Sequence, residues 1–171
     1  MAYYRKEWAT LLVVSVGLVR AGFRMRWWPT LKGAWLVLRA NRLWAPHPDN
    51  DPDGARRCME KFYRLVAAEA HEQLDTVEAA RLEVEWWRLH RERQRGTGGV
   101  DPLVEALTDL YAFVYKAPAD DVRPAAALRA EAMDVSDRWV AEGCSLESPL
   151  ISEERSLLVR SCAAQRAAVH R

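Results

Sequence analysis

Apolar residues recur at three- and four-residue intervals along nearly the whole chain, and the two-residue alternation typical of β-strands is almost absent. This period is that of an α-helix with one buried face. Short segments separate the periodic stretches, so consecutive helices should pack roughly antiparallel. The pattern predicts an all-α fold of about seven helices, over approximately 3–25, 30–44, 51–74, 75–95, 101–117, 124–142 and 149–171.

Turn-forming and capping residues separate these predicted helices. Asp51, Asp75 and Asp101 are each placed to cap the helix that follows, and Pro52 and Pro102 suit a first helical turn. Glu78 completes a capping-box pattern with Asp75. The segments APHPDND and GTGG break the chain, and Gly143 suits the end of a helix. Since no connection is long enough to be a linker, we expect a single domain spanning residues 1–171.

The first predicted helix contains the apolar run ATLLVVSVGLV, residues 9–19. Eleven residues are too few to span a bilayer as a helix, and runs of this length are more often core or interfacial segments. We therefore expect an apolar N-terminal helix near the centre of the bundle.

Charge is unevenly distributed along the 171 residues. Residues 1–45 hold eight basic side chains, one acidic side chain and five of the eight tryptophans, whereas the remaining residues hold 17 basic and 23 acidic side chains. This predicts a basic, Trp-rich helical hairpin, 1–45, packed on an acidic helical bundle, 51–171. The net charge of +1 does not favour binding to nucleic acid.

Composition also indicates the setting of the protein. Half of the residues are hydrophobic and 29% are charged, as in a globular chain. The three cysteines form no CxxC motif, which favours a reducing compartment over a disulfide framework. Arginine outnumbers lysine by 21 to 4, which suggests a GC-rich bacterial genome. We expect a cytoplasmic bacterial protein.

The stretch DNDPDGARRCME, residues 49–60, fits a calcium-loop template. Its cation ligands would be Asp49, Asp51, Asp53 and Glu60. Pro46 and Pro48 interrupt the helix that should lead into such a loop, and no second loop is present. The alternative is a helix start with Asp51 as the N-cap, and we favour it.

Acid–base candidates lie on two of the predicted helices. Glu69 falls on an apolar stripe, where a buried carboxylate would have a raised pKa and act as a general acid or base. The alternative is an acid at the edge of the stripe, paired with an arginine. Glu83 and His90 share one helical face with Trp87, and Trp86 lies about 100° away. These residues form either an acid–base site beside an aromatic wall or a packing face with His90 at its rim.

Two tyrosines are also candidates for the ligand-binding wall formed by Trp86 and Trp87. Tyr111 and Tyr115 are spaced to stack on one helix, where their hydroxyl groups either contact a ligand or reach solvent at the core boundary. The sequence has no Glu-x-x-His pair, phosphate loop, GxGxxG, GxSxG or HExxH motif. We therefore expect neither a cofactor nor a transition metal.

The tryptophans of residues 1–45 have arginine neighbours and allow two interpretations. Such a pattern suits a central core helix or an oligomer contact, and it also suits a membrane interface without a spanning helix. The tryptophans concerned are Trp8, Trp27, Trp28, Trp35 and Trp44.

Two functions follow from these patterns, and the sequence does not decide whether the protein is an enzyme. The first is binding of an apolar or aromatic small molecule between helices, including cofactor-independent acid–base chemistry by Glu69, Glu83 and His90. The second is a non-catalytic interaction module. In that case the basic, Trp-rich hairpin docks on a partner protein, a second copy of the chain or an anionic membrane surface.

Overall fold

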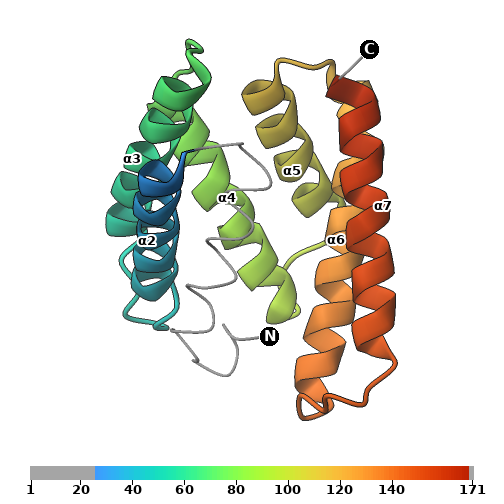
Figure 1. The fold of residues 1–171 in the computed structure, drawn as a ribbon. Helices are drawn as coiled ribbons and strands as arrows, with labels where there is room; N and C mark the ends of the chain where they lie inside the picture. The colour runs from blue at the N-terminus through green and yellow to red at the C-terminus, as the bar shows by residue number, and fades with distance from the viewer. Residues whose placement is uncertain (1–25, 170–171) are drawn as a thin grey trace. The chain divides into compact units, whose positions relative to one another are not determined.

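The computed structural model describes residues 26–169, and within that range it contains α-helices and no β-strand. The all-α fold class is confirmed. The helix expected over 3–25, with its place near the centre of the bundle, lies outside the described residues. The helices are α2 (Trp27–Trp44), α3 (Pro52–Ala70), α4 (Thr76–Gln94), α5 (Val100–Tyr115), α6 (Ala119–Ala141) and α7 (Leu150–Val169), as labelled in Figure 1.

The chain divides into two compact units at a point within α4. Unit 1 ends at Val84 and unit 2 begins at Glu85. The single-domain organisation therefore stays a prediction.

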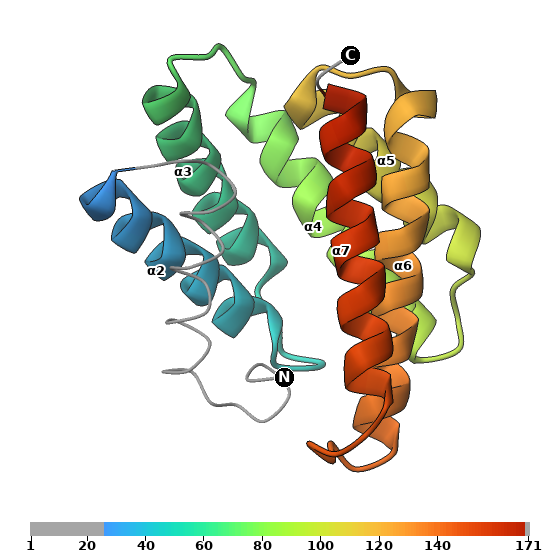
Figure 2. The same ribbon diagram turned by 45° about the vertical axis from the view of Figure 1, so that its right-hand side comes forward.

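Unit 1 is built on a hairpin of α2 and α3, which lie side by side in Figures 1 and 2. Small side chains on α2, including Gly33, Ala34 and Ala40, are buried and permit close helix packing. Phe62 and Tyr63 of α3 are buried as well, and their rings meet edge to face. The result is a helix, α2, that has one buried side and one exposed side.

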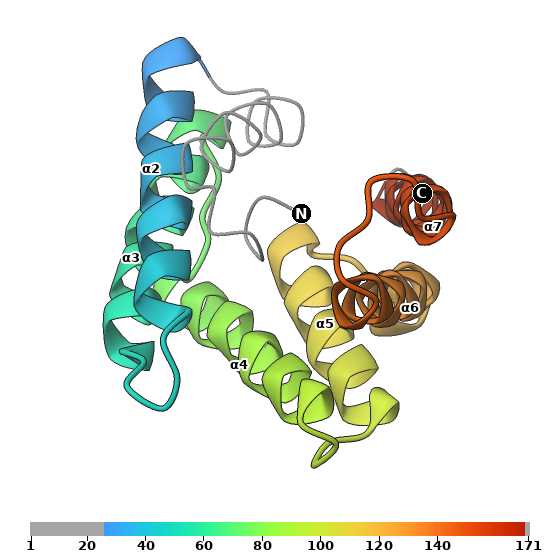
Figure 3. The same ribbon diagram turned by 90° about the horizontal axis from the view of Figure 1, so that it is seen from below.

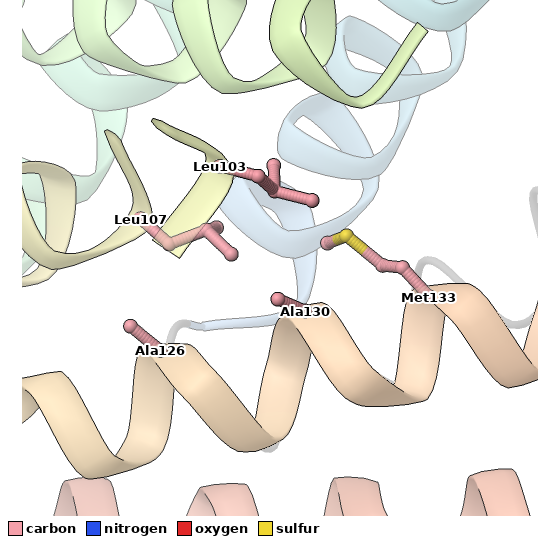
Figure 4. Packing of buried hydrophobic residues seen from close by; sticks show 5 residues of the cluster. All are labelled: Leu103, Leu107, Ala126, Ala130 and Met133. Atoms are coloured by element: carbon pink, nitrogen blue, oxygen red, sulfur yellow. The ribbon is translucent and has the colours of Figure 1, made fainter. Parts of the chain in front are cut away.

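Unit 2 contains the helical pairs α5–α6 and α6–α7, and the latter pair runs side by side in Figure 3. One core cluster joins α5 to α6, and Figure 4 shows leucines of α5 above the small side chains of α6. The cluster consists of Leu103, Leu107, Ala126, Ala130 and Met133.

A second core cluster joins α6 to α7. Trp139 is 1% exposed, and its indole N–H donates to the carbonyl oxygen of Ser145 at 2.7 Å. Leu150 and Leu157 of α7 pack in the same cluster. Because this buried tryptophan has its hydrogen-bond partner, the loop between α6 and α7 is held against the core.

Several predicted helix boundaries differ from the observed ones. Helix α3 ends at Ala70 rather than near residue 74, because His71 adopts a left-handed conformation with φ 55°. Helix α6 begins at Ala119, and Pro124 lies inside it rather than at its start. Proline removes only one backbone donor there, while the extra turn buries Val122 completely.

Capping was predicted correctly for two of three aspartates. Asp51 accepts a hydrogen bond from the Gly54 N–H at 2.7 Å, as an N-cap does. Asp75 accepts from the backbone of the first turn of α4. Asp101 is not a cap, because α5 starts at Val100 and its N-cap is Gly99. The carboxylate of Glu78 bonds Arg81 instead of completing the expected capping box.

Candidate functional site

Glu69 near the end of α3 forms an ion pair with Arg26, the residue before α2. The Arg26 Nη2 and Nε atoms donate to the two carboxylate oxygens of Glu69 at 3.1 and 3.3 Å. This arginine lowers the pKa of Glu69, mainly through the side-chain hydrogen bond. The expected raised pKa is therefore wrong, and the arginine-paired alternative is confirmed. A carboxylate that holds its charge this firmly is a poor general acid.

Glu83 in the α4 portion of unit 1 has a tyrosine partner. The Tyr63 hydroxyl donates to Glu83 Oε2 at 2.7 Å, so this partly buried bond links α3 to α4. A carboxylate that accepts a short hydrogen bond from a neighbouring helix contributes to packing specificity. Glu83 therefore joins α4 to α3 through Tyr63, whereas Glu69 joins α3 to the start of α2 through Arg26.

His90 lies in unit 2 and pairs with Asp137 on α6. The His90 Nε2 and Asp137 Oδ2 atoms are 3.0 Å apart, and the Gln94 side-chain amide donates to the other Asp137 oxygen at 2.7 Å. Only 14% of the His90 side chain and 24% of the Asp137 side chain are exposed. Asp137 therefore orients a partly shielded imidazole.

An ion pair between Arg93 and Asp134 also joins α4 to α6. Arg93 binds both carboxylate oxygens of Asp134, through Nε at 2.6 Å and Nη2 at 2.5 Å. Asp134 and Asp137 lie three residues apart on α6, and so do Arg93 and His90 on α4. The sequence analysis identified His90 but missed its partners, because their pairing depends on residues more than 40 positions away.

Trp86 lies beside His90, with ring centroids 6.5 Å apart. Trp86 packs against the α5–α6 core cluster, and its Nε1 atom is buried without a hydrogen-bond acceptor among the described residues. Trp87 meets it edge to face and is 8% exposed. Within unit 2 the Trp86 ring therefore lies between Trp87 and the His90 imidazole, and its role as a ligand wall stays a prediction.

The two predicted tyrosines lie on α5. Their rings stack edge to face, with centroids 6.3 Å apart, as expected for residues four positions apart. Tyr111 packs against the α5–α6 core cluster, and so does Trp86, whereas Tyr115 is 36% exposed. Of the predicted site residues, His90, Trp86, Trp87 and Tyr111 share unit 2, and Trp86 contacts both His90 and Trp87 there.

The calcium-loop stretch forms a loop end and a helix start. Asp51 is the N-cap of α3, as preferred above, while Asp53 bonds Arg56 and Glu60 bonds Arg64. Asp49 is exposed in the preceding loop. Among residues 26–169 no group of three or more histidine, cysteine or carboxylate side chains is arranged to hold a metal ion.

One face of α2 carries tryptophans and cations exposed together. Trp28 and Trp35 are 78% and 50% exposed, and Lys32, Arg39 and Arg42 are exposed as well. Their positions advance by steps of four, three, four and three residues, so they follow one side of the helix. We call these five residues the α2 face. Helix α2 contains no acidic residue.

The other tryptophans of residues 1–45 differ in their exposure. Trp27 is 54% exposed at the N-terminus of α2, whereas Trp44 at its C-terminus is 8% exposed and belongs to the core. Trp8 lies outside the described residues. None of the helices within residues 26–169 combines the length and apolarity needed to cross a bilayer.

Comparison with protein-family models, with curated proteins and with solved structures finds no match for this chain.

Proposed function

We propose that the protein is a peripheral membrane-binding module whose α2 face docks on an anionic lipid surface. The observation that carries this proposal is the exposed row of two tryptophans and three cations on a helix without acidic residues. It develops the interaction-module hypothesis from the sequence.

The tryptophans supply the affinity for the bilayer interface. An indole ring has an apolar body and one N–H donor, so it is well placed at the level of the lipid headgroups. Large apolar side chains that are half exposed or more in a row on one helix commonly mark an interaction site. Trp28 and Trp35 meet that description, and Trp27 adds a third ring at the helix end.

The cations supply the preference for anionic lipid. Each Lys or Arg near such a surface contributes about 1 kcal/mol. Lys32, Arg39 and Arg42 together would therefore contribute about 3 kcal/mol, or roughly a hundredfold in partitioning. Because cations and rings share one face, α2 should bind at headgroup depth rather than deep in the acyl chains.

A membrane fits this surface better than a nucleic acid does. The rings stand on the outer side of a single helix whose other side is buried in unit 1, and such a convex face suits a broad, deformable surface. Single-stranded nucleic acid is generally held in a basic groove with stacking platforms.

The test is co-sedimentation of the full chain with vesicles. Vesicles of phosphatidylcholine with phosphatidylglycerol should bind the protein, and pure phosphatidylcholine vesicles should bind it at least tenfold less. The double variant Lys32→Glu/Arg39→Glu should lose most of this binding, and so should Trp28→Ala/Trp35→Ala.

The matched control is Lys61→Glu, an exposed lysine on α3 outside the α2 face. It should bind like the unchanged protein. Equal losses for Lys61→Glu and the double variant would reduce the effect to bulk charge and contradict the proposal. Binding to single-stranded DNA or to an acidic protein without binding to vesicles would replace the membrane with that partner.

A second candidate function is binding of an apolar or aromatic small molecule in unit 2, as first expected from the sequence. The observation that favours it is the His90–Asp137 pair beside the Trp86 ring. In the neutral tautomer whose Nε2–H faces Asp137, the Nδ1 atom of His90 would be the ring acceptor, and the buried Trp86 N–H would be a donor for a ligand oxygen.

Native mass spectrometry of protein purified from its own source tests this second candidate. A retained organic molecule that is lost in His90→Asn, with α-helical content unchanged by circular dichroism, would support the site. A protein without a bound molecule would contradict this candidate function, and so would a molecule that His90→Asn retains as well as the unchanged protein does.

A further inference from the structure

Helix α7 has a buried side and an exposed side with different chemistry. Leu150, Leu157 and Ala168 are buried, and the Ser161 hydroxyl donates to the Ala125 carbonyl oxygen of α6 at 2.8 Å. These contacts fix the rotation of α7 within unit 2. The opposite side of the helix is therefore presented outward in a defined register.

The outward side has an apolar centre between two arginines. Val159 is 62% exposed, and Cys162 and Ala163 are exposed beside it. Together with Leu158, Arg155 and Arg166, these residues line a surface hollow of about 350 Å³. We call these six residues the α7 face. The sequence from 155 to 169 contains three arginines and no acidic residue.

We propose that the α7 face binds an amphipathic α-helix of a partner protein whose apolar stripe is flanked by acidic side chains. Arg155 and Arg166 are eleven residues apart, which corresponds to about 16 Å along a helix. Acidic residues about three turns apart on the partner would meet both guanidinium groups. The small side chains of Cys162 and Ala163 leave room for the partner backbone to approach closely.

A second copy of the same chain is the less favourable occupant. Antiparallel pairing of two α7 faces about a twofold axis places Arg155 of one copy against Arg166 of the other. Parallel pairing about an axis along the helices places each arginine against itself. Both arrangements juxtapose like charges at each end of the contact, which opposes association. Charge complementarity instead favours a partner with acidic ends.

The probe for this proposal is a pair of synthetic 18-residue helical peptides with the same leucine stripe. One peptide carries glutamates three turns apart at the stripe ends, and its twin carries lysines there. Fluorescence anisotropy should show the glutamate peptide binding the full chain at least tenfold more tightly. The double variant Arg155→Glu/Arg166→Glu should reverse this preference, and bound glutamate peptide should protect the Cys162 thiol from maleimide.

Arg160→Glu is the matched control, because Arg160 is exposed on α7 but does not line the hollow. It should change the affinity less than twofold. The proposal is overturned if neither peptide binds, if both bind equally, or if Arg160→Glu acts like the double variant. Protection of Cys162 by phosphatidylglycerol vesicles alone would assign the face to lipid and also overturn it. Lys32→Glu/Arg39→Glu should leave peptide binding unchanged, so this proposal and the membrane proposal fail separately.

Discussion

At Glu69, one arginine determines how a carboxylate on an apolar stripe behaves. The side chain of Glu69 is 15% exposed, yet the Arg26 guanidinium holds its pKa below the usual range. Burial and ion pairing shift a carboxylate pKa in opposite directions, and here pairing has the larger effect. Glu69 is thus better suited to stabilising the start of α2, next to Trp27 and Trp28, than to proton transfer.

The Glu69 pair makes a prediction about stability and pH. Because the folded-state pKa of Glu69 is lowered, its stabilising contribution is present above the unfolded-state pKa, about 4.3, and is lost as pH falls through the folded-state pKa. Glu69→Gln should therefore flatten the acid side of the stability profile. Urea unfolding between pH 3 and 7 measures this.

Arg26→Gln should flatten the profile in the same way, and the double variant should add no further change. An unchanged acid side in both single variants would show that the pair makes no pH-dependent contribution. Glu78 and Glu105 have arginine partners that lower their pKa as well, so the wild-type profile should keep part of its acid slope.

At the scale of the helices, starts are encoded more clearly than ends. An aspartate placed before an apolar period marks the starts of α3 and α4, since its carboxylate satisfies free backbone N–H groups. The ends of α3 and α5 lie at His71 and Lys116, which adopt left-handed conformations usually taken by glycine or asparagine. Pro118, two residues after Lys116, signals the end of α5, whereas no glycine, asparagine or proline lies near His71 to mark the end of α3.

Asp75 and Asp101, which the sequence predicts as N-caps alike, should differ in their contribution to stability. Asp75→Ala removes a cap that accepts from two backbone N–H groups and should lower the free energy of unfolding by about 1 kcal/mol. Asp101→Ala removes only a first-turn charge, because Gly99 is the N-cap of α5, and should lower it by about 0.5 kcal/mol or less. Urea unfolding of both variants measures the difference. Equal losses would show that the assigned caps are wrong.

At the scale of the whole molecule, the two proposed surfaces belong to different units and recognise different chemistry. We propose that the α2 face of unit 1 binds anionic lipid and that the α7 face of unit 2 binds an acidic amphipathic helix. A chain that binds lipid through one face and a helix through the other would bring a partner protein to a membrane surface. The small net charge of +1 conceals this organisation, because the excess of basic residues in 1–45 is offset by acidic residues elsewhere.

Membrane binding by the whole protein should depend strongly on salt. Raising the ionic strength from about 0.1 to 1 M shortens the Debye length from about 10 to 3 Å, which screens Lys32, Arg39 and Arg42 from the lipid headgroups. Co-sedimentation with phosphatidylglycerol vesicles should fall at least tenfold over that range. Binding that persists undiminished would mean that the tryptophans act without the cations.

The sequence alone determined the all-α class, the breaks between helices and two of the caps, because these features depend on residues only a few positions apart. The sequence grouped His90 with Trp87 on one helical face, whereas in the structure the ring beside His90 is that of Trp86. Tertiary structure decided which of these residues are paired and which are exposed. Arg26 pairs with Glu69, 43 positions away in the sequence, and His90 pairs with Asp137, 47 positions away. Trp44 is buried whereas Trp28 is exposed, although both belong to α2. Such outcomes depend on how helices pack, and a local period carries no information about the partner that a side chain will meet.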